Sequence, residues 1–391
     1  MTNTETPPDP FIIAGIPATN NALYHRIRFL AGDPAAYISI PDHGSILLIR
    51  DIETARARKH ARADTVTHPA LHEPPQGLSG DRETATAQAA ATILADHNIN
   101  AVRADRTLPL SFHHELTNAG IAVQYDPNLA VTERRAKDDA EIEHLAEAQK
   151  HTEQIVEHAC RVICNATPDA SGILQWSDAD GSGPLTAERL RSLIAVSLLK
   201  LGYEMPHGCV VAPGPHSGDP HERGNGPIRT AQPVVVDVFP RSTETRYHGD
   251  CTRTACHGQA PPWLQTMHNA VNDAKQRAQA ATHAGATGEQ VHRAATAAIT
   301  AAGFPMGLPP EKPDENFASM PHGTGHGIGL EVHEPPLLDL KGPELVAGDA
   351  LTIEPGLYNP TKGGVRVEDL VIVTTTGIVN LNTIHTGLHW D

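Results

Sequence analysis

The sequence predicts two domains, an α/β domain at the N-terminus and a larger domain of the α+β class after it. A chain of 391 residues is long for a single hydrophobic core. Roughly the first 130 residues alternate short apolar runs with helical patterns, which is typical of an α/β domain. The basic run Arg134–Lys137 (RRAK) then precedes a long amphipathic segment. We therefore place the two domains at residues 1–135 and 136–391.

The elements of the first domain follow from local patterns. Two apolar runs flank the turn sequence PDHGS at Pro41–Ser45, which predicts a β-hairpin. An Ala-rich stretch predicts a helix over Glu83–His97. Further elements are expected at Ile99–Ala104 (strand), Leu110–Ala119 (helix) and Ile121–Tyr125 (strand). No spacing typical of a catalytic site occurs in this domain.

The second domain begins with a long helix that carries an apolar stripe and has acidic residues near its start, where the helix dipole favours them. Thr186 is suited to cap a helix that runs to Lys200. Two more helices are expected at Trp263–Ala281 and Gly288–Ala302. Five short strand-like segments surround these helices, and each of them contains an acid or a histidine.

Composition narrows the class of function. The net charge of −16 and the pI near 5.8 argue against a nucleic acid or an anionic membrane as partner. No run approaches 18 apolar residues, and the first ten residues lack the basic and apolar regions of a signal peptide. We therefore expect a cytoplasmic protein. The five cysteines are odd in number and scattered, and we assign them no function.

One stretch, His322–Glu334 (HGTGHGIGLEVHE), is unusually dense in histidine and glycine. As a strand it would place His322 and His326 on one face, and the alternating glycines would let a backbone or a ligand come close. His333 has the opposite parity, so a bend or bulge must bring it to the same site. Taken alone, the stretch could also be a glycine-rich loop without chemistry.

Four carboxylates lie within strand-like runs, where a charge is costly to bury unless it is paired or binds a cation. Each of them alone could belong to a buried ion pair or a turn. Together they would place about four negative charges in one cavity, which two divalent cations can neutralise. Such ions would lower the pKa of a shared water and polarise a carbonyl group. The four carboxylates are Asp237 (PVVVDVF), Asp250 (GDCTRT), Glu354 (LTIEPGLY) and Glu368 (GVRVEDLVIV).

In this order the segments resemble the pita-bread metallopeptidases, a family that includes Xaa-Pro aminopeptidase, prolidase and, more distantly, methionine aminopeptidase. HGTGHGIGLEVHE matches the proline-peptidase form of the signature. The resemblance covers essentially the whole chain. It implies an α+β fold, with a pita-bread catalytic domain preceded by a smaller creatinase-like α/β N-terminal domain.

The resemblance also implies the metal ligands. Asp250 and Glu368 would bridge two metal ions, and Glu354 would also act as a base or proton shuttle. Manganese is the expected metal, with cobalt, zinc or iron as alternatives, because carboxylates with one imidazole are hard to borderline ligands. The full ligand set would be Asp237, Asp250, His326, Glu354 and Glu368.

Further roles follow from the same resemblance. His221 would be the catalytic histidine that follows a VxxG segment, with His216 as the nearer competitor. His333 would hold the scissile carbonyl, and His322 would line the proline side. Arg366 would bind the substrate carboxylate or support a ligand. Thr252 would donate a hydrogen bond to a ligand.

The resemblance implies a dinuclear aminopeptidase that cleaves between an N-terminal residue and proline by attack of a metal-bridging hydroxide. The expected partners are a peptide with proline at its second position and a second copy of the chain. Alternatives are an Xaa-Pro dipeptidase, a metal-dependent lyase or other amide hydrolase, and a non-catalytic binding protein. The chain departs from the family pattern at Phe239, where glycine is usual, and in an Asp237–Asp250 spacing two residues longer than usual.

Overall fold

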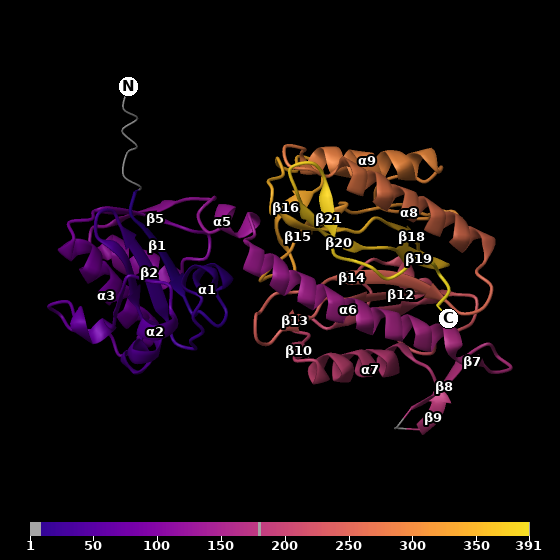
Figure 1. Cartoon of the computed structure of the whole chain (residues 1–391), viewed down its shortest axis with the longest axis horizontal. Coiled ribbons are helices and arrows are strands. Elements are labelled where there is room, and N and C mark those ends of the chain that lie inside the picture. The colour runs from indigo at the N-terminus through magenta and orange to yellow at the C-terminus, as the bar shows by residue number, and fades with distance from the viewer. Residues whose placement is uncertain (1–8, 179–180, 391) are drawn as a thin grey trace. The chain divides into compact units, whose positions relative to one another are not determined.

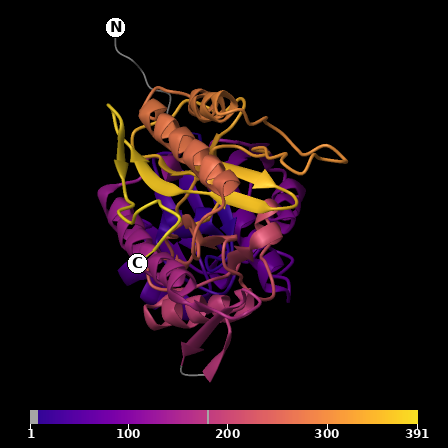
Figure 2. The ribbon, with the colours of Figure 1, turned by 90° about the vertical axis from the view of Figure 1, so that its right-hand side faces the viewer.

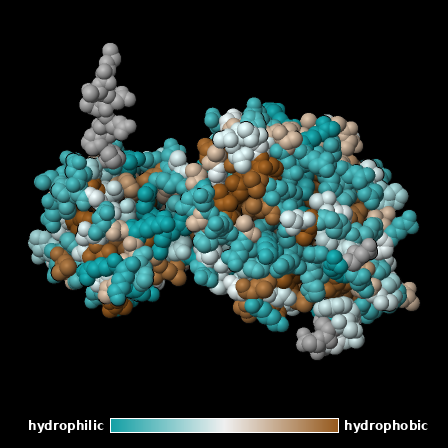
Figure 3. Space-filling view, in the orientation of Figure 1, coloured by the Kyte–Doolittle hydropathy of each residue, from teal (hydrophilic) through white to brown (hydrophobic). Residues whose placement is uncertain are grey.

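The computed structural model describes residues 9–178 and 181–390 (Figure 1). The chain divides into two compact units, Met1–Arg134 and Arg135–Asp391. Within the described residues, no helix has the length and apolar character needed to cross a membrane. The face shown in Figure 3 is largely hydrophilic, in keeping with the strong net negative charge.

The N-terminal unit is a mixed six-stranded sheet with the order β4-β3-β2-β1-β5-β6. Ile12 and its neighbours on one face pack against α3 and α4, while Ile13 belongs to the core beneath α1 and α2. Helices therefore cover both faces of the sheet, as the alternation of strands and helices predicts. The elements are β1 (Phe11–Gly15), α1 (Asn21–Ile27), β2 (Ala35–Ile40), β3 (Gly44–Leu48), α2 (Thr54–His60), β4 (Thr65–Thr67), α3 (Arg82–Asp96), β5 (Ala101–Ala104), α4 (Leu110–Asn118), β6 (Ala122–Tyr125) and α5 (Thr132–Arg135).

The first half of the second unit is a small sheet covered by two helices. Strands β11, β12 and β14 form the sheet, and α6 and α7 pack on it around one hydrophobic core. Thr186 caps α7 by accepting a hydrogen bond from the N–H of Arg189, as predicted. The elements are α6 (Asp139–Asn165), β7 (Thr167–Pro168), β8 (Leu174–Asp178), β9 (Gly181–Pro184), α7 (Ala187–Lys200), β10 (Tyr203–Glu204), β11 (Cys209–Pro213), β12 (Pro233–Val238), β13 (Arg241–Ser242) and β14 (Cys251–Cys256).

The second half repeats this plan with a larger sheet in the order β16-β15-β17-β20-β21 and a separate β18–β19 hairpin. Helices α8 and α9 share a core with these strands, and Figure 2 shows α8 lying across them. The elements are α8 (Pro262–Ala281), α9 (Gly288–Ala301), β15 (Gly325–Gly327), β16 (Glu334–Leu338), β17 (Ala350–Ile353), β18 (Gly356–Asn359), β19 (Gly363–Arg366), β20 (Asp369–Val373) and β21 (Ile378–Asn380).

A buried ion network joins the two halves. Arg253 on β14 is fully buried, and its Nη2 lies 2.9 Å from Asp369 Oδ1 on β20. Lys275 on α8 lies 2.5 Å from the other oxygen of Asp369. Burial alone works to raise the pKa of Asp369, but Lys275 and Arg253 lower it to about 2. One carboxylate is thus held ionised between two cations that come from different halves.

We predict that Asp369→Ala destabilises the second unit by about 3–5 kcal/mol, because it leaves two cations buried without a counter-charge. Asp273→Ala on α8 removes only an exposed pair with Arg277 and should cost less than about 1 kcal/mol. Urea unfolding followed by tryptophan fluorescence reports this unit selectively, since all three tryptophans lie in it. Equal shifts for the two variants would contradict the prediction.

Candidate metal centre

Two acids enter the site from the first half of the unit. Asp237 lies near the end of β12 and is in register with Thr252 on β14, while Asp250 directly precedes β14. Asp237 is 8% exposed and Asp250 is 3% exposed. Both carboxylates are therefore almost completely removed from water, which is costly unless they are compensated.

The glycines of the histidine-rich stretch allow neighbouring backbones to approach, as predicted. A Cβ atom on Gly325 would lie 2.0 Å from the carbonyl oxygen of Thr352, and one on Gly327 would lie 2.5 Å from that of Pro335. Any side chain at these positions would collide with main chain. The regular strand is shorter than the sequence suggests, because only Gly325–Gly327 forms β15.

The bend needed to bring His333 to the site is present. The pairing of β15 with β16 shifts in register between His326 and Gly327. The ring centroid of His333 lies 4.3 Å from that of His326. The two imidazoles thus share one site although their parity along the chain differs.

The remaining two acids lie at breaks between strands. Leu351–Tyr358 and Gly364–Val373 were each expected to form one strand. That expectation is wrong, because each run is divided into two strands of different sheets, with Glu354 and Glu368 at the breaks. In the first run, Pro355 has no N–H to donate to a ladder, so regular pairing ends there.

These segments place the predicted ligands in one cluster. Donor atoms of Asp250, His326 and Glu368 all lie within 4.8 Å of one another. The Nε2 atom of His326 is 3.3 Å from Glu354 Oε1 and 4.0 Å from Asp250 Oδ2. Three carboxylates and one imidazole therefore converge from β14, β15 and the two strand breaks.

Asp237 belongs to the same cluster and lies beside Arg366. The Nη2 atom of Arg366 lies 2.6 Å from Asp237 Oδ2, and its Nε lies 3.9 Å from Glu354 Oε2. Its Nη1 donates to the hydroxyl of Tyr358 at 3.0 Å and to the carbonyl of Pro220 at 3.3 Å. Arg366 is thus occupied by protein groups on every side, which favours its expected role as a support for ligands over a role in binding substrate.

The carboxylates repel one another. Burial, together with the charges of the neighbouring acids, raises the pKa values of Asp250 and Glu368 well above their ordinary values. Burial also raises the pKa of Asp237, whose Oδ1 atom is buried without a hydrogen-bond partner among the described residues. An unsatisfied carboxylate oxygen beside three more acids and an imidazole fits a divalent cation of the manganese, iron, cobalt or zinc type.

His326 and Glu354 form a pair that compensates part of this charge, as Arg366 does for Asp237. Burial works to raise the pKa of Glu354, but the hydrogen bond and the charge of His326 lower it to about 2. In return Glu354 raises the pKa of His326 despite the burial of the ring. Glu354 is therefore the carboxylate that is most readily ionised at neutral pH.

Sequence reasoning missed two residues that hold the site together. Tyr358 connects His322 to Arg366, because its hydroxyl lies 2.9 Å from His322 Nε2 and accepts from Arg366. Gln149 on α6 clamps the backbone of Asp250, donating to its carbonyl at 2.7 Å and accepting from its N–H at 2.8 Å. The position of Tyr358 four residues after Glu354 was a usable signal, whereas nothing marked Gln149 within its amphipathic helix.

The other histidines lie at different distances from the centre. Burial lowers the pKa of His333, and the charges of His326, His207 and His221 add to that effect. His221 also contributes to the lowered pKa of His322, so it lies near the site although it is exposed. His216, on the 3-10 turn Gly214–Gly218, accepts a hydrogen bond from Asn225 N–H at 3.2 Å.

Comparison with known proteins places this site in a family. Residues 143–375 match metallopeptidase family M24. The chain belongs to family M24. A probable dipeptidase, PepE from Mycobacterium tuberculosis, is 36% identical over 192 residues, 48% of each chain. An Xaa-Pro dipeptidase from Pyrococcus furiosus is 32% identical over 188 residues, 47% of this chain and 50% of that protein. The chain thus spans about half the length of these relatives.

The fold extends beyond those matches. An X-Pro aminopeptidase from Thermotoga maritima superposes with a TM-score of 0.76 at 21% identity and covers 97% of both chains. This likeness concerns the fold, and it includes the N-terminal unit. The predicted α+β class, a pita-bread catalytic domain after a smaller creatinase-like domain, is therefore confirmed.

The long loop of this M24 chain leaves the strands in register. Pairing of β12 with β14 runs without a shift from Pro233 to Val238. The loop instead forms β13, which pairs with β10, and Arg241 on β13 lies 2.6 Å from Glu204. A hairpin with two extra residues keeps side-chain parity, so Asp237 and Asp250 stay on the same side.

We predict that Thr252→Val lowers the affinity of this M24 centre for Mn²⁺ by roughly ten- to a hundredfold. The Thr252 hydroxyl donates to Glu368 Oε2 at 2.7 Å and accepts from Arg366 Nε at 3.3 Å. Thr254→Val is the matched control, because the Thr254 hydroxyl donates to a main-chain carbonyl at 3.0 Å and to no carboxylate. Titration calorimetry with Mn²⁺ measures both, and equal losses of affinity would contradict the prediction.

Proposed function

We propose that this M24 protein is a dinuclear metal-dependent aminopeptidase that hydrolyses the bond between an N-terminal residue and proline. The observation that carries the proposal is the convergence of four carboxylates, three of them buried, with His326 in one cluster. The names of similar proteins, an Xaa-Pro dipeptidase and an X-Pro aminopeptidase, support the choice of substrate.

Five residues would hold the metal ions: Asp237, Asp250, His326, Glu354 and Glu368. Two divalent ions bound there would lower the pKa of a water molecule and polarise the scissile carbonyl. Hydrogen bonds from neighbouring side chains would orient these ligands. Thr252 donates to Glu368, and Gln149 holds the backbone of Asp250.

Glu354 is suited to move the proton. Its carboxylate lies 3.3 Å from His326, within the expected ligand set, where it could take a proton from the attacking water. It would then deliver this proton to the proline nitrogen, which leaves as an amine. His333, beside His326, would donate to the carbonyl oxygen as negative charge develops on it. His322, held by Tyr358, would line the proline side.

An Xaa-Pro dipeptidase is the second candidate, since two of the similar proteins are named as dipeptidases. It uses the same centre and differs only in the length of the peptide accepted. Manganese as the preferred metal, a homodimer and a cytoplasmic location stay predictions. A lyase, another amide hydrolase and a binding protein are the alternatives if the following assay detects no peptide cleavage.

We predict that metal-free protein reloaded with Mn²⁺ cleaves peptides with proline at the second position, and that Asp250→Ala does not, although it remains folded by circular dichroism. Asp250 lies within 4.8 Å of His326 and Glu368, so its loss removes a carboxylate from the middle of the expected ligand set. Release of the N-terminal residue is compared for Xaa-Pro dipeptides and Xaa-Pro-Yaa peptides, with Co²⁺ and Zn²⁺ in parallel. Preference for the longer peptide supports the aminopeptidase, and activity confined to dipeptides supports the dipeptidase. Absence of cleavage with metal bound would overturn both.

We predict that His221→Ala lowers kcat more than His216→Ala does. His221 lies near enough to affect the pKa values of His322 and His333, whereas the ring of His216 accepts a hydrogen bond from Asn225 N–H. Loss of a positioned proton donor or acceptor costs roughly a hundredfold or more. Steady-state kinetics on one Xaa-Pro-Yaa peptide gives both values. A larger loss of kcat in His216→Ala would assign the role of catalytic histidine to His216 instead.

A further inference from the structure

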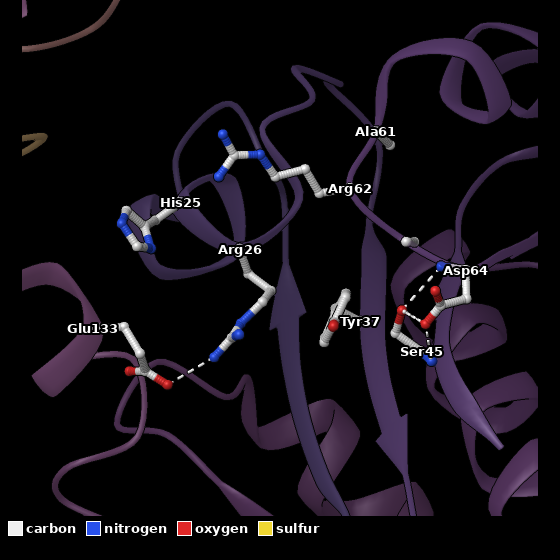
Figure 4. Close-up of a pocket in the computed structure, with 9 residues that line it drawn as sticks. His25, Arg26, Tyr37, Ser45, Ala61, Arg62, Asp64 and Glu133 are labelled. Carbon is white, nitrogen blue, oxygen red and sulfur yellow. Dashed lines mark hydrogen bonds and ion pairs between the residues drawn. The ribbon is translucent and has the colours of Figure 1, made fainter. Parts of the chain in front are cut away.

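The N-terminal unit contains an open pocket that the proposed peptidase reaction does not use (Figure 4). Its volume is about 570 Å³, within the range of roughly 300–1,000 Å³ that is usual for small-molecule sites. It is lined from the end of α1, from β2 and β3, from the segment between α2 and β4, and from α5. All of these belong to the first unit, so the pocket is distinct from the metal centre.

One side of the pocket is cationic. Arg26 is already engaged, because its Nη2 lies 2.7 Å from Glu133 and its guanidinium lies over the ring of Tyr37 at 5.6 Å. Arg62 is anchored only through its backbone, whose N–H donates to the carbonyl of Ile27 at 2.8 Å. Its guanidinium, which Figure 4 shows on the same side as His25, makes no hydrogen bond or ion pair with the described residues. Arg62 therefore has its donors available for a ligand.

The facing side carries a fixed negative charge. The Oδ2 atom of Asp64 accepts from the N–H and the hydroxyl of Ser45 at 2.8 and 2.7 Å, and Asp64 N–H donates back to that hydroxyl at 2.9 Å. These hydrogen bonds lower the pKa of Asp64, so it is ionised at neutral pH. Because both bonds use Oδ2, the Oδ1 atom has no partner among the described residues.

An aromatic ring lies between the two charged sides. Figure 4 shows Tyr37 in the middle of the pocket, and its ring stacks on Phe11 with centroids 6.0 Å apart. Its hydroxyl makes no hydrogen bond with the residues that the structure describes. Ala61 and Ala63, which also line the pocket, are too short to fill it. The pocket thus offers apolar contact between an unpaired cation and an unpaired anion.

We propose that this pocket binds the zwitterion of a free α-amino acid, with its carboxylate on Arg62, its ammonium on Asp64 and its side chain against Tyr37. Guanidinium groups pair with carboxylates through two parallel hydrogen bonds. An inorganic anion would be repelled by Asp64 and Glu133, and a metal cation would be repelled by the two arginines. A ligand with both charges satisfies both sides.

The ligand class does not depend on the reaction at the metal centre. If the proposed function holds, every turnover releases one free amino acid, and the pocket would then bind a product of the enzyme itself. If that function fails, the charge arrangement around Arg62 and Asp64 is unchanged, so the binding proposal stands or falls by itself.

We predict that full-length, metal-loaded protein binds L-leucine or L-proline in titration calorimetry. Binding must persist in the Asp250→Ala variant, which removes the metal centre as a competing site. For leucine, 4-methylpentanoate lacks the ammonium and 3-methylbutylamine lacks the carboxylate, so each should bind roughly tenfold or more weakly. Inorganic phosphate should bind no better than these analogues.

In the Asp250→Ala background, Arg62→Gln and Asp64→Asn should each weaken amino-acid binding by roughly ten- to a hundredfold. Lys59→Gln and Asp42→Asn are the matched controls, because they remove the same charges from exposed positions outside the pocket lining. Thermal unfolding verifies that all four variants are folded. The proposal would be overturned if Asp250→Ala abolished amino-acid binding while Arg62→Gln left it intact. It would also be overturned if neither amino acid bound, or if phosphate bound as tightly as leucine.

Discussion

Mutual repulsion among buried carboxylates is the constraint on which the catalytic unit depends. Asp237, Asp250, Glu354 and Glu368 come from separate strands and strand breaks, yet they lie in one cluster, in which all but Glu354 are buried. Such a group is stable only where cations or protons offset its charge. His326 and Arg366 offset part of it, and the unsatisfied Oδ1 of Asp237 fits a bound cation that would offset the rest.

The repulsion among these acids also explains why hydrogen bonds hold the backbone around them in place. An acid that could turn away would relieve the repulsion and would no longer be placed to bind a metal ion, and hydrogen bonds hold the backbone of Asp250 and Glu368 in position. Gln149 holds the backbone of Asp250, and Arg253 donates to the main-chain carbonyls of Thr252 and Glu368. Arg253 is itself held by Asp369, whose other carboxylate oxygen pairs with Lys275. The ion network that joins the two halves of the unit therefore also sets the spacing of the ligands.

The histidines near the four acids differ from them in that a neutral imidazole ring can both donate and accept a hydrogen bond. Burial lowers the pKa values of His322 and His333, which keeps both rings neutral at pH 7 and able to donate one hydrogen bond and accept another. His326 differs, because Glu354 raises its pKa. One stretch of chain thus contributes a candidate metal ligand, His326, and two neutral rings. The different electrostatic surroundings of these rings, rather than their spacing, separate their roles.

The sequence by itself determined the long amphipathic helices, the β-branched strand that carries Asp237 and the five candidate ligands, because these signals lie in periodicity and in polar residues placed where burial is costly. Only the tertiary structure decided that the two C-terminal runs break at Glu354 and Glu368, that Gln149 and Tyr358 support the site, and that Arg366 is occupied by protein groups. The pocket beside Arg62 is equally invisible in the sequence. Each of these depends on contacts between segments far apart in the chain, such as the 2.8 Å bond from Asp250 N–H to Gln149, whose partners are separated by 101 positions. Local patterns report the neighbours of a residue along the chain, whereas the site is made by its neighbours in space.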